Sequence, residues 1–222
     1  MFIGHFAVAL AAKSRAPRPS LGTYIAAAQA LDLLWPALLL LGVEHVEIRP
    51  GDTAVTPLAF TSYPWSHSLL MTLVYGAVVA GAYAALRRDR RGALVLGLAV
   101  VSHWLLDALT HRPDLPLLPS SPTLVGLGLW NSVAATVVVE GTMFAGAAAM
   151  YLRSTRALDT TGRIATWVLL ALLAVIYLLN IFSPAPPPGV DAIAWSAFGM
   201  WLFVLLAAWA DRHRTTKSAV SA

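Results

Sequence analysis

The chain contains no cysteine among its 222 residues, and it has few charged residues. Without cysteine it cannot form a disulfide, a thiolate metal site or a cysteine nucleophile, so histidine, aspartate and glutamate remain as metal ligands. Charged residues make up 12% of the chain, against roughly 25% in an ordinary soluble domain. This composition argues against a soluble globular protein.

Hydrophobic residues make up 58% of the chain, and the mean hydropathy is +0.70. They form runs of about 20 residues, the length of a membrane-spanning helix, near residues 21–42, 65–86, 92–110, 127–150, 164–182 and 192–210. Residues 1–12 form a shorter apolar run, which we expect to be a half-span or re-entrant segment because twelve helical residues cover only about 18 Å.

We therefore predict an all-α fold, a polytopic transmembrane helix bundle of about six spans plus a short N-terminal half-span. Residues 1–211 form a single membrane domain, and residues 212–222 form a polar tail that we expect to fray.

Basic residues are concentrated in alternate loops between the predicted spans, the pattern expected when those loops all lie on one side of a membrane. They gather before the first predicted span, after the second, between the fourth and fifth, and after the last, and only Arg49 and Arg112 fall on the other side. Because cytoplasmic loops collect Lys and Arg, we predict a multi-pass protein of the cell (cytoplasmic) membrane with a cytoplasmic C-terminus. The net charge of +4 lies in short loops rather than on one basic face, so the expected partner is the lipid bilayer and not nucleic acid.

Ionisable residues inside the predicted spans carry the functional information, because each costs several kcal/mol in a bilayer unless it is paired or metal-bound. His103 and Asp107 are spaced i, i+4, which places both side chains on one helix face about 6 Å apart. This spacing suits two metal ligands, or one ligand with an orienting carboxylate, but also a hydrogen-bonded pair that only fixes helix packing. His67 lies at a matching depth in the neighbouring span, where a packed interfacial histidine is the alternative.

Three further residues are candidates. Asp32 lies near the middle of its span, and Pro36 is expected to bend the helix there; the alternative is a protonated carboxyl group hydrogen-bonded to a neighbouring helix. His5 lies in the short N-terminal segment and alone would be interpreted as a surface histidine. Glu140 lies deep in the fourth span. Two roles are open for it, general base or buried hydrogen-bond donor.

Together these residues resemble the pattern of the predicted membrane-bound metal-dependent hydrolases, a bacterial family of small polytopic proteins. That pattern has an N-terminal His, an acid in the first full span, a His-Ser pair opening the next, and an H-x-x-x-D helix. The matching residues here are His5, Asp32, His67 with Ser68, and His103 with Asp107. The chain departs from relatives in having Leu34 in place of a second acid and Pro64-Trp65 in place of an Arg-Gly pair, and one carboxylate fewer argues against a two-metal site.

The resemblance implies that His5, Asp32, His67, His103 and Asp107 bind a divalent metal, with zinc favoured and manganese or iron as alternatives. The metal would activate a water, and Asp107 or Glu140 would accept its proton. The expected activity is hydrolysis of a lipid-like or amphiphilic ester or phosphoester. The alternative is a non-enzymatic role, as a small transporter or as a membrane scaffold with paired intramembrane polar residues.

Overall fold

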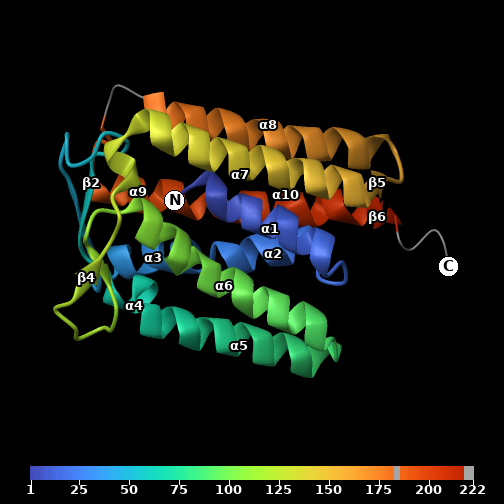
Figure 1. Cartoon of the computed structure of the whole chain (residues 1–222), viewed down its shortest axis with the longest axis horizontal. Coiled ribbons are helices and arrows are strands. Elements are labelled where there is room, and N and C mark those ends of the chain that lie inside the picture. Colours follow the sequence, from blue (N-terminus) through green and yellow to red (C-terminus); the bar gives the residue numbers. More distant parts are fainter. Residues whose placement is uncertain (183–185, 218–222) are drawn as a thin grey trace.

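A computed structural model describes residues 1–182 and 186–217, and most of these residues belong to one bundle of helices (Figure 1). The principal helices are α1 (Ile3–Arg15), α2 (Leu21–Ala28), α3 (Ala30–Leu40), α4 (Pro64–His67), α5 (Leu69–Arg87), α6 (Arg90–Thr110), α7 (Val133–Ser154), α8 (Thr160–Phe182), α9 (Val190–Phe198) and α10 (Met200–Arg212). Among the described residues, five helical segments are long and apolar enough to cross a membrane, with α9 and α10 counted as one, and the bent pair α2–α3 makes up to six. The predicted polytopic all-α bundle is confirmed.

Several predicted boundaries need correction. The first predicted span is two helices, α2 and α3, bent by 55° at Gln29, whereas Pro36, where we expected the bend, lies inside α3. The second is interrupted at Ser68, whose hydroxyl caps α5 by accepting from the Met71 N–H, so that His67 lies in the separate α4. The fourth span begins later than predicted, at Val133, because Gly128 has the left-handed φ of 72° and a short 3-10 turn follows it.

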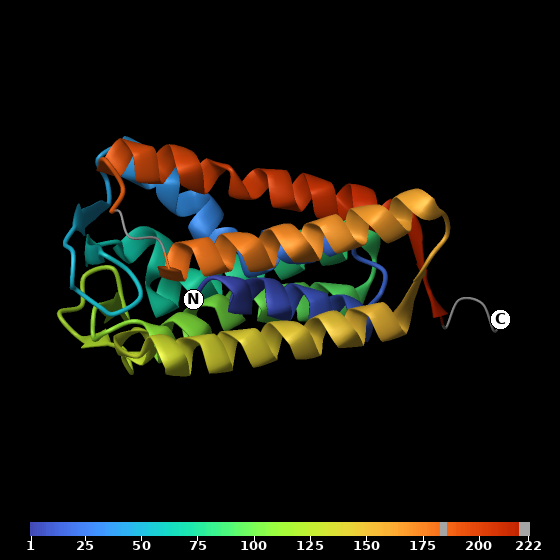
Figure 2. The same cartoon turned by 90° about the horizontal axis from the view of Figure 1, so that it is seen from above.

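The N-terminal segment lies in the middle of the bundle (Figures 1 and 2). α1 packs against α2, α6, α7 and α8, and its side chains Phe6 and Leu10 are almost completely buried. The predicted half-span is therefore enclosed by other helices. It is too short to cross a bilayer, at about 20 Å for 13 residues, but it brings its first turn to membrane depth.

Small residues allow two close helix contacts. A Cβ atom at Gly76 of α5 would lie 3.1 Å from the Gly97 carbonyl oxygen of α6, and a Cβ at Gly22 of α2 would lie 2.5 Å from the Val204 carbonyl oxygen of α10. Such approaches are typical of membrane helices, which associate through backbone proximity rather than through the hydrophobic effect.

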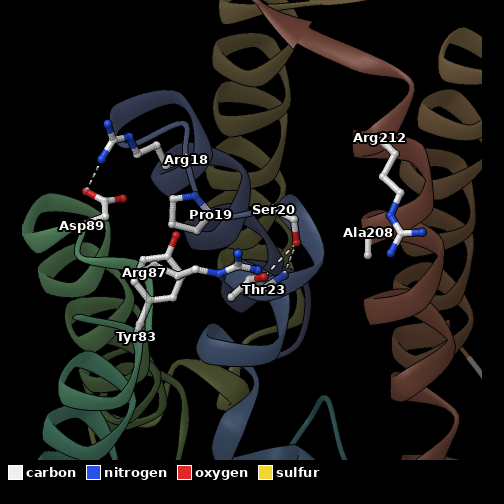
Figure 3. A pocket seen from close by; sticks show the side chains of 9 residues that line it. All are labelled: Arg18, Pro19, Ser20, Thr23, Tyr83, Arg87, Asp89, Ala208 and Arg212. Carbon is white, nitrogen blue, oxygen red and sulfur yellow. Dashed lines mark hydrogen bonds and ion pairs between the residues drawn. The ribbon is translucent and has the colours of Figure 1, made fainter. Parts of the chain in front are cut away.

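The two ends of the bundle differ. At the end that we name the basic end, β5 (Thr155–Ala157) pairs with β6 (Arg214–Thr216), so part of the tail that we expected to fray is ordered, while residues 218–222 lie outside the described residues. A hollow lined by arginines also opens there (Figure 3). At the opposite end, the hairpin end, β1 (His45–Ile48) pairs with β2 (Leu58–Ser62) and β3 (Leu115–Pro116) with β4 (Leu124–Val125).

Candidate metal centre

The structure brings together all five residues that were predicted as metal ligands, from four different helices. They form two overlapping groups that share His103: His5, His103 and Asp107, and Asp32, His67 and His103. Within each group, one ligand atom from every residue lies within 4.8 Å of the others. The residues are thus close enough to share one centre.

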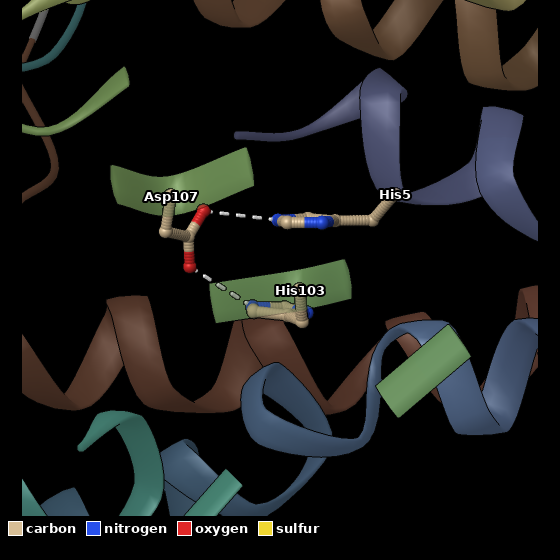
Figure 4. A group of neighbouring side chains, drawn as sticks. All are labelled: His5, His103 and Asp107. Carbon is tan, nitrogen blue, oxygen red and sulfur yellow. Dashed lines mark hydrogen bonds and ion pairs between the residues drawn. The ribbon is translucent and has the colours of Figure 1, made fainter. Parts of the chain in front are cut away.

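Asp107 joins the two histidines of the first group (Figure 4). Its Oδ1 lies 3.1 Å from His5 Nε2, and its Oδ2 lies 3.1 Å from His103 Nε2. The two imidazole rings stack, with their centroids 3.7 Å apart and their planes within 5°. The amino group of Met1 also contacts Oδ1. His5 is 1% exposed, so it is not the surface histidine that its position near the terminus suggested.

Asp32 and His67 complete the set from the other side. His67 Nε2 lies 3.3 Å from Asp32 Oδ1 and 3.9 Å from Asp107 Oδ2, and His103 Nε2 lies 3.6 Å from Asp32 Oδ1. All three histidines therefore direct Nε2 toward the two carboxylates. The Asp32 side chain is 26% exposed, against at most 5% for the other four.

The opposite nitrogens of two of these rings have fixed partners. His103 Nδ1 hydrogen-bonds the Ala28 carbonyl oxygen at 2.7 Å, an acceptor that the interruption of the helix at Gln29 makes available. His67 Nδ1 lies 2.6 Å from Ser66 Oγ, which in turn donates to Glu44 Oε2 at 2.6 Å. Such partners orient metal-binding imidazoles in proteins.

Sequence reasoning did not assign a role to Glu44 or Ser66. Glu44 is 1% exposed and accepts hydrogen bonds from the backbone N–H groups of Trp65 and Ser66, both at 2.8 Å, as well as from the Ser66 hydroxyl. The adjacency of Ser66 to His67 was the available signal, but Glu44 lies 22 residues away in the chain and nothing in its local sequence points to this contact.

Glu140, predicted as a proton acceptor, binds the backbone at the start of α1. Its Oε2 accepts hydrogen bonds from the backbone N–H groups of Phe2 and Gly4, at 3.1 and 3.3 Å. These N–H groups belong to the start of α1, where a negative charge is favourable. The carboxylate therefore fixes the first turn of α1, and with it His5, while its catalytic role stays a prediction.

A second polar cluster lies beside the centre at the hairpin end, outside the spanning helices. Asp114 Oδ1 accepts from the Tyr63 hydroxyl at 2.7 Å and from His111 Nδ1 at 3.0 Å, and Asp114 Oδ2 accepts from Arg112 at 3.2 Å. Burial lowers the pKa of His111, against the opposing pull of Asp114. Burial, with the Asp114 charge, raises the pKa of Tyr63 well above its ordinary value. Neutral forms of both side chains therefore prevail near pH 7.

A cavity of about 600 Å³ reaches the centre. Asp32, His67 and Asp107 line its inner end, and apolar side chains of α8 and α10 line its walls. Two of these, Leu172 and Leu202, are 42% and 68% exposed, so apolar side chains that line the cavity also reach the outer surface of the bundle. We name it the site cavity; its volume is in the range of small-molecule sites.

The chain was compared with known proteins. No family model, curated protein or solved structure matches it. The resemblance carried by the motif residues therefore stays a prediction, and a functional assignment must rest on the geometry of the centre and of its cavity.

Proposed function

We propose that the centre binds a divalent metal and that the protein is a membrane-embedded, metal-dependent hydrolase. One observation carries the metal proposal. Because a carbonyl oxygen only accepts hydrogen bonds, His103 Nδ1 must carry the ring proton, and neutral His103 then directs the lone pair of Nε2 at Asp107 and Asp32. Lone pairs at these distances repel unless a metal ion, or a proton on His103 Nε2, lies between them.

The charge of the centre supports the same proposal. Two carboxylates with three neutral imidazoles carry two negative charges, and the Met1 amino group at Asp107 compensates one of them. One negative charge is then left in a setting where each unpaired charge costs several kcal/mol. His103 Nε2 is buried and makes no hydrogen bond with any residue in 1–182 or 186–217. In a protein without cysteine, zinc is bound by imidazole nitrogens and carboxylate oxygens. The same ligands also suit manganese or iron.

The residues divide into two functional sets. His5, His67, His103 and Asp107 are the buried ligands, and the metal that they would hold supplies Lewis acidity and a water of lowered pKa. Asp32, the carboxylate most exposed to the site cavity, would accept a proton at Oδ1 from a nucleophile entering there. The Ser66–Glu44 pair keeps the His67 ring in one orientation.

The site cavity favours a lipid-like substrate. Most of the side chains that line it are apolar, the two carboxylates and His67 lie where it reaches the centre, and its exposed lining residues Leu172 and Leu202 would face lipid in a bilayer. An amphiphilic ester or phosphoester would enter from the bilayer with its polar group toward the centre and its chain along Leu172, Ile176 and Leu206. The distribution of Lys and Arg along the sequence favours an orientation in which the C-terminus is cytoplasmic and the substrate enters from the outer leaflet.

Metal analysis tests the proposal. The purified full-length protein should contain bound metal, and His67→Ala and His103→Ala should each lose most of it while keeping their helical circular dichroism. Negligible metal in all three proteins would overturn the metal proposal. Hydrolysis of a panel of phospholipids and lipid-linked esters by the metal-loaded protein tests the activity.

A membrane scaffold with paired polar residues is the second candidate. It is favoured by the close His–Asp contacts themselves, which a protonated His103 would satisfy without metal. Asp32→Asn separates the two candidates: an enzyme loses hydrolysis and keeps its folded yield, whereas a scaffold loses folded yield.

A further inference from the structure

At the basic end, far from the candidate metal centre, a pocket of about 640 Å³ opens between three parts of the bundle (Figure 3). Three arginines line it from separate segments: Arg18 precedes α2, Arg87 ends α5 and Arg212 ends α10. We name it the arginine pocket. Its floor is the first turn of α2, with the hydroxyl groups of Ser20 and Thr23 2.8 Å apart.

The positive charge of the arginine pocket is poorly compensated. Among the described residues that line it, Asp89 is the one acid, and the Asp89 carboxylate already caps α6 by accepting from the Gly92 N–H at 3.1 Å. Arg18 reaches Asp89 only at 4.0 Å. Within residues 1–182 and 186–217, neither Arg87 nor Arg212 makes a side-chain hydrogen bond or an ion pair.

The orientation of the protein in the membrane does not by itself explain why these arginines line one pocket. A bias of Lys and Arg toward one side of the membrane requires charges in the loops, but it does not require side chains from three segments to line one hollow together with two hydroxyl groups and the Tyr83 ring. Arginine side chains with adjacent hydroxyl groups match the oxygens of a phosphate group.

An apolar stripe continues from the arginine pocket along α10. Arg212, Ala208, Leu205 and Trp201 follow at helical spacings of four, three and four residues, and so lie on one face. Leu205 is 63% exposed and Trp201 is 46% exposed. A molecule whose phosphate lies among the arginines can therefore lay an acyl chain along this stripe.

We propose that the arginine pocket binds the phosphate of an anionic phospholipid in the leaflet at the basic end. The ligand chemistry is a phosphate diester or monoester, held by Arg87 and Arg212 with Arg18 at the rim. Basic pockets between membrane helices bind anionic headgroups in this way. The site is separate from the candidate metal centre, and its occupancy does not depend on the proposed hydrolase activity.

Short-chain lipids test the proposal on the purified full-length protein. Binding of dihexanoyl phosphatidylglycerol, dihexanoyl phosphatidylcholine and glycerol phosphate would be titrated by microscale thermophoresis. We expect the anionic lipid to bind at least about tenfold more tightly than the zwitterionic one, since each arginine near an anionic headgroup adds to the attraction. Arg87→Gln combined with Arg212→Gln should abolish this preference.

A matched pair of variants is the control. Arg90→Gln combined with Arg156→Gln removes the same charge from the basic end outside the pocket and should keep the tenfold preference. Equal affinity of the wild type for both lipids, or an unchanged preference in the pocket variant, would overturn the proposal. Glycerol phosphate binding as tightly as the anionic lipid would overturn the lipid assignment in favour of a soluble phosphate ester.

Discussion

His103 Nδ1 hydrogen-bonds the carbonyl oxygen of Ala28, the last residue of α2 before the chain bends at Gln29. The contact links the broken span to the chemistry of the centre. In a continuous helix the Ala28 carbonyl would also accept a backbone N–H, whereas the break leaves it free for His103. The hydrogen bond at the break thus fixes which nitrogen of His103 faces the carboxylates.

Ser66→Ala should weaken metal binding without removing a ligand. The substitution leaves His67 Nδ1 without its 2.6 Å partner and separates the ring from Glu44, and loss of such an orienting contact costs about 10–100-fold in metal affinity. Competition with a metal chelator measures the change. Ser102→Ala is the matched control, because Ser102 also precedes a predicted ligand but donates only to the Ala99 carbonyl oxygen. An equal loss of affinity in both variants would contradict the orienting role of Ser66.

Substitutions of Glu140 distinguish its structural contact from its predicted catalytic role. Glu140→Ala leaves two N–H groups of α1 without their acceptor, which should cost about 1–3 kcal/mol of stability for each buried group left unpaired. Glu140→Gln retains an oxygen acceptor and should cost less. Thermal unfolding in detergent measures both. If Glu140→Gln keeps its metal and its stability but loses hydrolysis, Glu140 accepts a proton; if hydrolysis survives, its role is to hold α1.

Filling the site cavity should block a long-chain substrate. Ile176 lines the cavity from α8, and Ile176→Trp would occupy the space along which we place the acyl chain. We expect hydrolysis of long-chain substrates to fall at least about tenfold, corresponding to roughly 1.4 kcal/mol, with metal content unchanged. Leu179→Trp is the control, since Leu179 lies on the same helix, is 62% exposed and does not line the cavity. Equal activities of the two variants would argue against entry between α8 and α10.

Gly22→Ala should destabilise the bundle. Its new methyl group would lie 2.5 Å from the Val204 carbonyl oxygen and 2.6 Å from the Ala208 methyl group, so α2 and α10 must move apart, at a cost typical of overpacking of about 1–3 kcal/mol. The unfolding midpoint should fall. Gly141→Ala of α7 is the matched control, because no atom of another described segment lies within 4 Å of its new methyl group, and its midpoint should stay level or rise. Similar midpoints for both variants would show that α2 does not pack closely on α10.

Acid should remove the contribution of Asp114 to stability. Burial alone would raise the pKa of Asp114, but hydrogen bonds from His111, Tyr63 and Arg112 hold it below its ordinary value of 3.8. A lowered folded-state pKa stabilises the protein above pH 3.8, and this contribution is lost as the pH falls through the folded-state value. The difference in unfolding midpoint between the wild type and Asp114→Asn should therefore be largest at pH 7 and become smaller below about pH 4. A constant gap from pH 7 to pH 3 would contradict this cause.

The helices themselves could be predicted because each span is a local property of the chain. A run of about 20 apolar residues is stable as a helix in a bilayer whatever its neighbours are, so the existence of the long helices followed from hydropathy. The i, i+4 spacing likewise placed His103 and Asp107 on one face of α6. Breaks were harder to predict: Pro36 carried the local signal for a bend, but the chain bends at Gln29, whose own sequence gives none.

The sequence by itself determined the bundle, its apolar spans and the short set of polar residues that a membrane tolerates only with partners. Tertiary structure alone decided that α1 enters the middle of the bundle with His5 at its first turn, and that Glu44 reaches His67 through Ser66. Those contacts join residues far apart in the chain, up to 102 positions for His5 and Asp107. They depend on how helices pack side by side, which hydropathy and local spacing do not encode.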